Sequence, residues 1–258
     1  MRPWNCLDHE SVPDDDGVLY LMARGSEFVI HVDGRELMGN RMHGSEDALA
    51  DFAIDRMPPD DDAQVLVGGL GMGFTLSAVL RRLGPNGRAT VAELMPAVVR
   101  WNGEYTGKAA GYPLRDPRVD VYVGDVGDLV EKPPTRWSAI LLDVDNGPNA
   151  LTRPANGWLY TQHGLASARE ALREGGVLAI WSAAADDSLT ERLIEMGFDV
   201  ESLSFTEEGR PTEDDSGTHV LWMARASSRP AQSSRAAQAA HADLAASSGL
   251  DGTVSQQS

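Results

Sequence analysis

The sequence predicts an α/β fold in which a mostly parallel seven-stranded sheet carries helices on both faces, ends in a C-terminal antiparallel hairpin and follows a small N-terminal β-meander. Two observations lead to this prediction. From residue 64 onward, short apolar runs alternate with segments of helical periodicity, a pattern typical of parallel βαβ units. The last two apolar runs have no helix between them, so we expect a hairpin and one antiparallel edge strand.

The first 60 residues are predicted to stand apart from the main sheet. Residues 1–17 are polar and are expected to form a flexible arm. Residues 18–60 are expected to form the β-meander and one helix, because VLYLMA and EFVIHV have the composition of strands and Asp33-Gly34 is a typical hairpin turn. Ser45 is a suitable N-cap for the helix that follows.

Residues 61–226 are predicted to form one Rossmann-like domain. Strands are expected at QVLVGGL, RATVAEL, VDVYVGD, SAILLDV, VLAIWSA, DVESLSF and THVLWMAR, and helices at residues 74–83, 96–105, 160–173 and 187–196. Residues 227–258 are rich in Ser, Ala and Gln and poor in large apolar side chains, which is typical of a disordered tail.

The composition argues against several classes of protein. A net charge of −17 repels phosphate backbones, so nucleic-acid binding is disfavoured, whereas a small cationic substrate is attracted. The same acidity can equally serve solubility alone. No apolar run reaches about 18 residues and the N-terminus has no apolar signal segment, so we expect neither a membrane span nor secretion. Cys6 is the only cysteine, which excludes a disulfide framework, and we expect a cytoplasmic protein without a metal.

A glycine-rich turn, GGLGMG at residues 68–73, lies between the first strand of the main sheet and the following helix. Glycines at such a turn let the backbone approach a ligand, and the helix N-terminus presents free N–H groups. Glu93 ends the next strand, about 20 residues on, where an acid can accept hydrogen bonds from both ribose hydroxyls of a nucleoside. The alternative is a tight turn beside a surface acid. The candidate nucleoside-binding glycines are Gly68, Gly69, Gly71 and Gly73.

Two further acids end the next two strands. Asp125 ends the third strand, where it suits a hydrogen bond to an adenine amino group, although it can equally cap a turn. Asp143 ends the fourth strand. Because ligands bind at the carboxyl ends of the strands in an open sheet, these acids are expected to line one crevice. Carboxylates there favour a cation, such as a sulfonium or an amine, over a pyrophosphate.

Aromatic and imidazole side chains give weaker signals. Trp101, Trp158 and Trp181 are candidates for the walls of a nucleoside pocket, with packing in the core as the alternative. His43 and His163 are candidate bases, but an isolated histidine is more often structural.

Residues 18–225 resemble the spermidine synthase (polyamine aminopropyltransferase) superfamily, within the class I S-adenosylmethionine-dependent methyltransferase fold. The matching motifs are VLVGGLGMG, VAELMPAVVRWN, DPRVDVYVGD, AILLDVDNGP, LYTQHGL and LREGGVLAIW. The resemblance implies a dimeric transferase of polyamine biosynthesis, with S-adenosylmethionine or its decarboxylated form as co-substrate and a small cationic amine as acceptor. It also implies that Glu93 binds the ribose, that Asp125 contacts the adenine, and that Asp143 and Asp145 supply the catalytic base and hold the amine.

The sequence departs from the family's pattern at three places. Gly71 stands where the family has an Asp that holds the amino group of decarboxylated S-adenosylmethionine. The loop that begins DVDNGP at Asp143 is shorter than the family's, and the Tyr-His-Glu stretch after the meander is absent. Asp145 can therefore be a base or a turn cap. Three functions remain open: aminopropyl transfer, methyl transfer from S-adenosylmethionine to a small molecule, and nucleoside binding by a non-catalytic paralogue.

Overall fold

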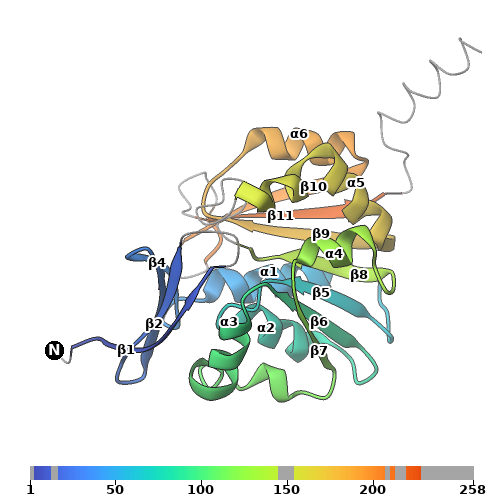
Figure 1. The fold of residues 1–258 in the computed structure, drawn as a ribbon. Coiled ribbons are helices and arrows are strands. Elements are labelled where there is room, and N and C mark those ends of the chain that lie inside the picture. Colours follow the sequence, from blue (N-terminus) through green and yellow to red (C-terminus); the bar gives the residue numbers. More distant parts are fainter. Residues whose placement is uncertain (1–2, 13–16, 145–153, 207–209, 213–218, 228–258) are drawn as a thin grey trace, which may run out of the picture.

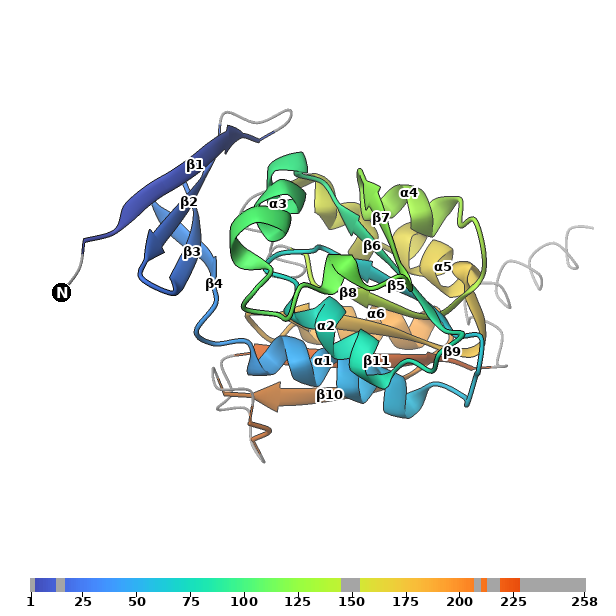
Figure 2. The same cartoon turned by 90° about the horizontal axis from the view of Figure 1, so that it is seen from below.

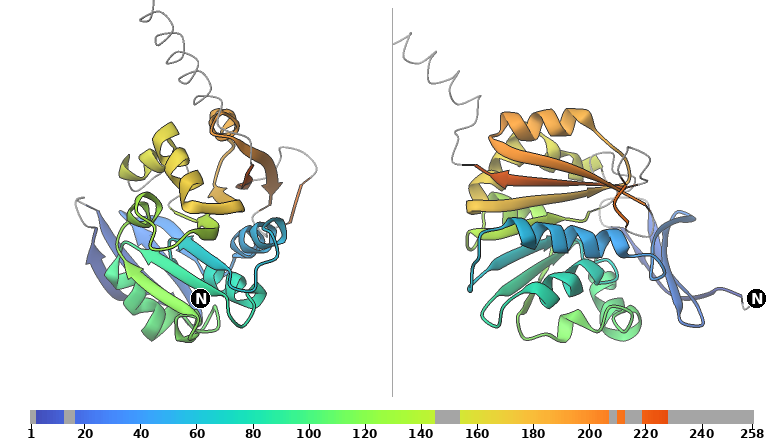
Figure 3. Two further views of the ribbon diagram at one scale, coloured as in Figure 1. Left: turned by 90° about the vertical axis from the view of Figure 1, so that its right-hand side faces the viewer. Right: turned by 180° about the vertical axis from the view of Figure 1, so that it is seen from behind.

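The computed structural model describes residues 3–12, 17–144, 154–206, 210–212 and 219–227, and these form two β-sheets (Figure 1). The smaller sheet has four strands and the larger has seven. Figure 2 shows the small sheet set at one end of the α/β body, on the side of α3, and the right-hand view of Figure 3 also shows it at one end. The predicted disordered tail, apart from its first residue, lies outside the described residues.

The small sheet is antiparallel throughout, in the order β1-β2-β3-β4. The predicted turn between its third and fourth strands is confirmed, since Asp33 and Gly34 have φ angles of 50° and 78°, the left-handed geometry of a tight hairpin. Its strands are β1 (Asn5–Ser11), β2 (Val18–Arg24), β3 (Glu27–Val32) and β4 (Arg35–Gly39).

The prediction of a flexible arm over residues 1–17 is wrong for β1, which pairs with β2. Strand β1 has the polar sequence NCLDHES, so it lacks the apolar alternation that identifies a strand. Pairing and one anchoring residue hold it in place instead. Asp8 accepts hydrogen bonds from the Trp101 indole at 2.7 Å and from Arg100 at 2.8 Å, and these bonds tie the small sheet to the body.

The large sheet confirms the predicted fold class. Its order is β10-β11-β9-β8-β5-β6-β7, and every pair is parallel except those that β11 makes with β9 and β10. Its strands are β5 (Gln64–Gly68), β6 (Arg88–Glu93), β7 (Val119–Val123), β8 (Trp137–Leu142), β9 (Leu172–Ser182), β10 (Phe198–Phe205) and β11 (His219–Ala226).

The antiparallel strand is not at the edge, contrary to the prediction. Strand β11 lies between β9 and β10, so β10 is the edge strand. The reason is burial: β11 has a run of five buried residues, Val220 to Ala224, whereas most of β10 is at least partly exposed. A strand that is apolar on both faces is stable only inside the sheet.

The helices form two layers around the sheet, each with its own apolar cluster. Along β5, Val65 and Val67 pack with α1, α2 and α3, whereas Leu66 between them packs with α4, α5 and α6. This alternation follows from the two-residue period of a strand. The helices are α1 (Gly44–Arg56), α2 (Phe74–Arg82), α3 (Pro96–Trp101), α4 (Val126–Glu131), α5 (Gln162–Ala171) and α6 (Asp187–Glu195).

Several helix boundaries differ from the prediction. His43 precedes α1, so Ser45 lies inside the first turn, where its hydroxyl donates to Glu46 at 2.6 Å instead of capping the helix. The helix expected at 96–105 changes to a π-turn at Asn102–Thr106, and α5 ends where the long strand β9 begins at Leu172. Helix α4 was not predicted. Within the described residues, no helix is long and apolar enough to cross a bilayer.

Candidate active site

A cavity of about 560 Å³ opens at the carboxyl ends of β5, β6, β7 and β8, and the small sheet covers its other side. Strands β5 and β8 are neighbours although β6 and β7 intervene in the chain, so the strand order reverses there, which is where α/β sheets bind ligands. Among the described residues, no Lys or Arg lines the cavity. Five carboxylates do, and they are Glu36, Glu46, Glu93, Asp125 and Asp143.

The glycine-rich turn forms the floor of this cavity. Gly69, Gly71 and Gly73 have φ angles of 86°, 50° and 89°, which favour glycine. A Cβ on Gly69 would collide with the backbone oxygen of Asp143, and one on Gly73 would lie 2.9 Å from Pro113. Of the four predicted glycines, Gly69 and Gly71 line the cavity, while Gly68 and Gly73 shape the turn behind it.

Glu93 is buried directly behind the glycine-rich turn. Its Oε2 accepts a hydrogen bond from the Leu70 N–H at 2.9 Å, and its Oε1 accepts one from the Met95 N–H at 2.8 Å. Burial raises the pKa of this carboxyl group, and the backbone donors oppose that rise. The N–H groups of Gly71 and Leu94 also interact with this carboxylate, so Glu93 fixes the glycine-rich turn, and it lines the cavity at the same place.

Asp125 lies at the cavity wall and also caps α4, so the capping role is confirmed and the adenine contact stays a prediction. Its Oδ1 accepts a hydrogen bond from the Gly127 N–H at 2.8 Å. Trp158 packs against α4 so closely that a Cβ on Gly127 would collide with the indole ring. This tryptophan therefore positions the capped turn and is absent from the cavity lining.

Asp143 follows β8 and faces α2 across the cavity floor. Its Oδ2 accepts a hydrogen bond from the Thr75 hydroxyl at 2.5 Å. Burial, and next the negative charge of Glu46, raise the pKa of Asp143 to about 7, while the Thr75 bond opposes the rise. Asp143 therefore changes protonation near neutral pH. The second predicted catalytic residue, Asp145, lies outside the described residues.

Several lining residues were not identified as site residues from the sequence. Glu46 is an acid in the first turn of α1, where acids commonly stabilise the helix end, so nothing marked it as a site residue. Met38 projects from β4 so that its sulfur lies 3.1 Å from the position of a Cβ on Gly71. The thioether thus fills the space that a side chain at position 71 would enter.

The tryptophans differ in their positions. Trp181 lines the cavity, with its ring centroid 4.9 Å from that of His219. Trp101 is fully buried in the core. Neither candidate histidine lines the cavity: His43 stacks on Phe74 at 4.0 Å, and His163 is exposed near Glu131.

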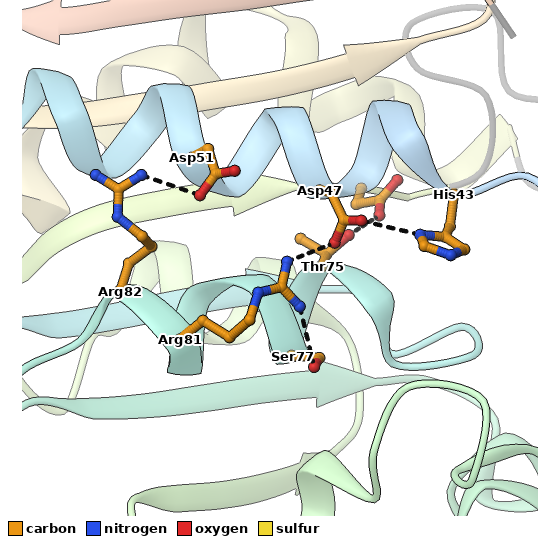
Figure 4. A network of polar contacts seen from close by, with 8 residues as sticks. His43, Asp47, Asp51, Thr75, Ser77, Arg81 and Arg82 are labelled. Carbon is orange, nitrogen blue, oxygen red and sulfur yellow. Dashed lines mark hydrogen bonds and ion pairs between the residues drawn. The ribbon is translucent and has the colours of Figure 1, made fainter. Parts of the chain in front are cut away.

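A polar network joins α1 to α2 beside the cavity (Figure 4). Asp47 lies 2.9 Å from the His43 ring nitrogen and accepts a hydrogen bond from Arg81 at 2.8 Å. One turn further on, Asp51 accepts a hydrogen bond from Arg82 at 3.0 Å. The network joins the first turns of α1 to the end of α2 across an exposed seam.

Similarities to known proteins agree with this architecture. No family model matches the chain. The polyamine aminopropyltransferase of Korarchaeum cryptofilum is 28% identical over 123 residues, which cover 48% of this chain and only 36% of that relative.

Solved structures extend the likeness to most of the chain. The spermidine synthase of Thermotoga maritima superposes with a TM-score of 0.65 at 19% identity, over 87% of this chain and 73% of the other. The fold is that of the spermidine synthases. A spermidine synthase in complex with the transition-state analogue AdoDATO also gives 0.65, at 18% identity and the same coverage. A probable spermidine synthase from Corynebacterium glutamicum gives 0.60 at 17% identity, over 87% of this chain and 80% of the other. The resemblance seen in the sequence motifs is confirmed for the fold.

Proposed function

We propose that the protein is an aminopropyltransferase of the spermidine synthase type, which transfers an aminopropyl group from decarboxylated S-adenosylmethionine to a polyamine acceptor. The observation that carries this proposal is the cavity at the strand-order reversal, whose described lining has five carboxylates and no basic Lys or Arg side chain. Both reactants are cations, and such a cavity favours them. The fold and the curated relative support the same assignment.

The nucleoside would occupy the part of the cavity formed by β6 and the glycine-rich turn. Glu93 lines the cavity at the end of β6, where a carboxylate suits the two ribose hydroxyls, and Asp125 suits the adenine amino group. Gly69 and Gly71 leave the backbone open to the ligand there. The sulfonium group then lies toward Asp143, where its positive charge meets carboxylates.

The reaction requires mainly positioning, because the sulfonium already activates the carbon that is attacked. A neutral amine nitrogen attacks the carbon next to the sulfonium sulfur, and the C–N bond forms as the C–S bond breaks. The sulfur keeps the electron pair and leaves as the thioether methylthioadenosine. The proton lost by the amine passes to the carboxylate of Asp143, whose pKa of about 7 suits a general base at neutral pH.

Methyl transfer from S-adenosylmethionine is the second candidate function, and one observation favours it. Met38 fills the space beside Gly71, so no acid stands where the related sequences hold the amino group of the decarboxylated co-substrate. Without that acid, the protein gains less binding free energy from the amino group of the decarboxylated co-substrate.

Product analysis distinguishes these functions. The purified protein is incubated with 1,4-diaminobutane and either decarboxylated S-adenosylmethionine or S-adenosylmethionine itself. Methylthioadenosine formed only from the decarboxylated form supports aminopropyl transfer. S-adenosylhomocysteine formed with an acceptor supports methyl transfer. Binding of either nucleoside without any product supports a non-catalytic paralogue.

We further propose a cytoplasmic homodimer that associates through the small sheet. Strands β1 and β2 expose Leu7 and Tyr20, at 39% and 38%, beside the β1 edge, which no other described strand covers, and such edges invite pairing with another chain. Sedimentation velocity at micromolar concentration is expected to show a dimer. A monomer at every concentration tested would contradict this proposal.

A further inference from the structure

Glu46 differs from the other acids of α1 in what it faces. Asp47, Asp51 and Asp55 each form an ion pair with Arg81 or Arg82 of α2. Glu46, in the same first turn as Asp47, lines the cavity instead. Its Oε2 accepts a hydrogen bond from the buried hydroxyl of Ser45 at 2.6 Å, which fixes the carboxylate on that side.

Asp143 lines the same cavity. The Thr75 hydroxyl holds its Oδ2 at 2.5 Å, and the two carboxylates are close enough for the charge of Glu46 to act on Asp143. In the described part of the chain, neither carboxylate forms an ion pair with Lys, Arg or His. Two acids held by hydroxyl groups on one cavity, without a cation, repel each other until a positive group enters.

We propose that Glu46 and Asp143 together hold one primary ammonium group of the substrate, so that Glu46 is a substrate-binding residue of this chain. This inference rests on the proposed function and names the residue that binds the acceptor amine. An ammonium has three N–H donors, which suits two carboxylates and a further acceptor. Glu46 keeps its charge through the reaction, while Asp143 takes the proton.

The other ionisable groups of the cavity wall do not supply this pair with a cation. Three of them are acids on other elements, and His219 lies beside Trp181. The ionisable groups of the described lining are Glu36 of β4, Glu46 of α1, Glu93 of β6, Asp125 before α4, Asp143 after β8 and His219 of β11.

Calorimetric binding of 1,4-diaminobutane tests the inference, with methylthioadenosine present and at pH values from 6 to 9. Glu46→Gln should weaken diamine binding about tenfold or more, since it removes one of two charged acceptors. Binding of methylthioadenosine alone should change less than about twofold. Glu46→Gln should also move the protonation of Asp143 to lower pH, because the neighbouring negative charge is lost.

Asp47→Asn is the matched control, because Asp47 carries the same charge one residue along the same turn but is absent from the cavity lining. It should bind the diamine as the unchanged protein does. Glu46→Asp keeps the charge with a shorter arm and should bind with intermediate affinity, provided that its melting temperature shows a folded protein. Equal diamine affinity in Glu46→Gln and Asp47→Asn, or no diamine binding by the unchanged protein, would overturn the inference. Loss of binding in Glu46→Gln without any methylthioadenosine formed by the unchanged enzyme would support the inference and refute the proposed function instead.

Discussion

Acidic residues on the two sides of α1 have different neighbours and different effects. Toward α2, its acids are neutralised by Arg81 and Arg82 across a solvent-exposed seam. Toward the cavity, Glu46 lies near Asp143, a second acid, and its negative charge raises the pKa of Asp143. Exposed ion pairs contribute little to stability, whereas like charges in a partly buried cavity shift protonation strongly. Which of its neighbours a carboxylate faces therefore matters more than its place in the sequence.

Removing the proton acceptor should have the largest effect on the cavity side. Asp143→Asn is nearly isosteric, so methylthioadenosine binding should persist while turnover falls about 100- to 10,000-fold. Steady-state rates with 1,4-diaminobutane measure this loss. Asp145→Asn is assayed in parallel, and full turnover in Asp143→Asn with loss in Asp145→Asn would assign the base to Asp145 instead.

Loss of the predicted ribose-binding acid, Glu93, should have a smaller effect. Glu93→Ala removes a charged acceptor, so methylthioadenosine binding should weaken by about 1.5–3 kcal/mol. Calorimetry measures the dissociation constant. Glu93→Gln keeps an acceptor for only one of the two backbone hydrogen bonds that fix the turn, and its melting temperature shows how far the turn is loosened. An unchanged dissociation constant in both variants would rule out a ribose-binding role.

The pH dependence of turnover should follow the protonation of Asp143. Asp143 must be deprotonated to accept a proton, so the rate should fall by about tenfold per pH unit below its pKa of about 7. The Thr75 hydroxyl stabilises the charged form, so Thr75→Val should raise that pKa and move the acidic limb to higher pH. If the acidic limb of the pH–rate profile lies at the same pH in Thr75→Val, a group other than Asp143 controls it.

The seam between α1 and α2 should show the smallest effect. Arg81→Ala breaks an ion pair in which Arg81 is 54% exposed, so the free energy of unfolding should fall by less than about 1 kcal/mol. The KM for the amine should not change. Urea unfolding and a KM measurement check both statements, and a large rise in KM would mean that the seam positions Glu46 more tightly than its exposure indicates.

The alternation of strands and helices was sufficient to predict the large sheet. The order of the acids along it was also sufficient to predict which strands end at the cavity. Glu93, Asp125 and Asp143 follow successive strands, and the parallel sheet brings all three to one edge. This succeeded because strand direction fixes the edge at which such residues lie, whatever the details of packing.

Features that depend on contacts between distant segments were not predictable. Strand β1 is polar, and only its pairing with β2 and the bond from Trp101 to Asp8 reveal it. The antiparallel strand β11 lies inside the sheet because of its burial on both faces, which depends on the neighbouring layers. Glu46 had the same local signal as Asp47, and the orientation of α1 against α2 decides which of them faces the cavity.

The contact between Met38 and Gly71 makes the evolutionary histories of two distant positions depend on each other. Gly71 has a φ of 50°, a backbone geometry that Asp tolerates better than most residues, so the backbone itself permits an acid there. The sulfur of Met38, 3.1 Å from the Cβ position, is what opposes it. An acid at Gly71 therefore requires Met38 to shift or to be replaced by a smaller residue. Changes at the two positions are expected to be non-additive, and a lineage that acquires both gains most by changing Met38 in the small sheet first.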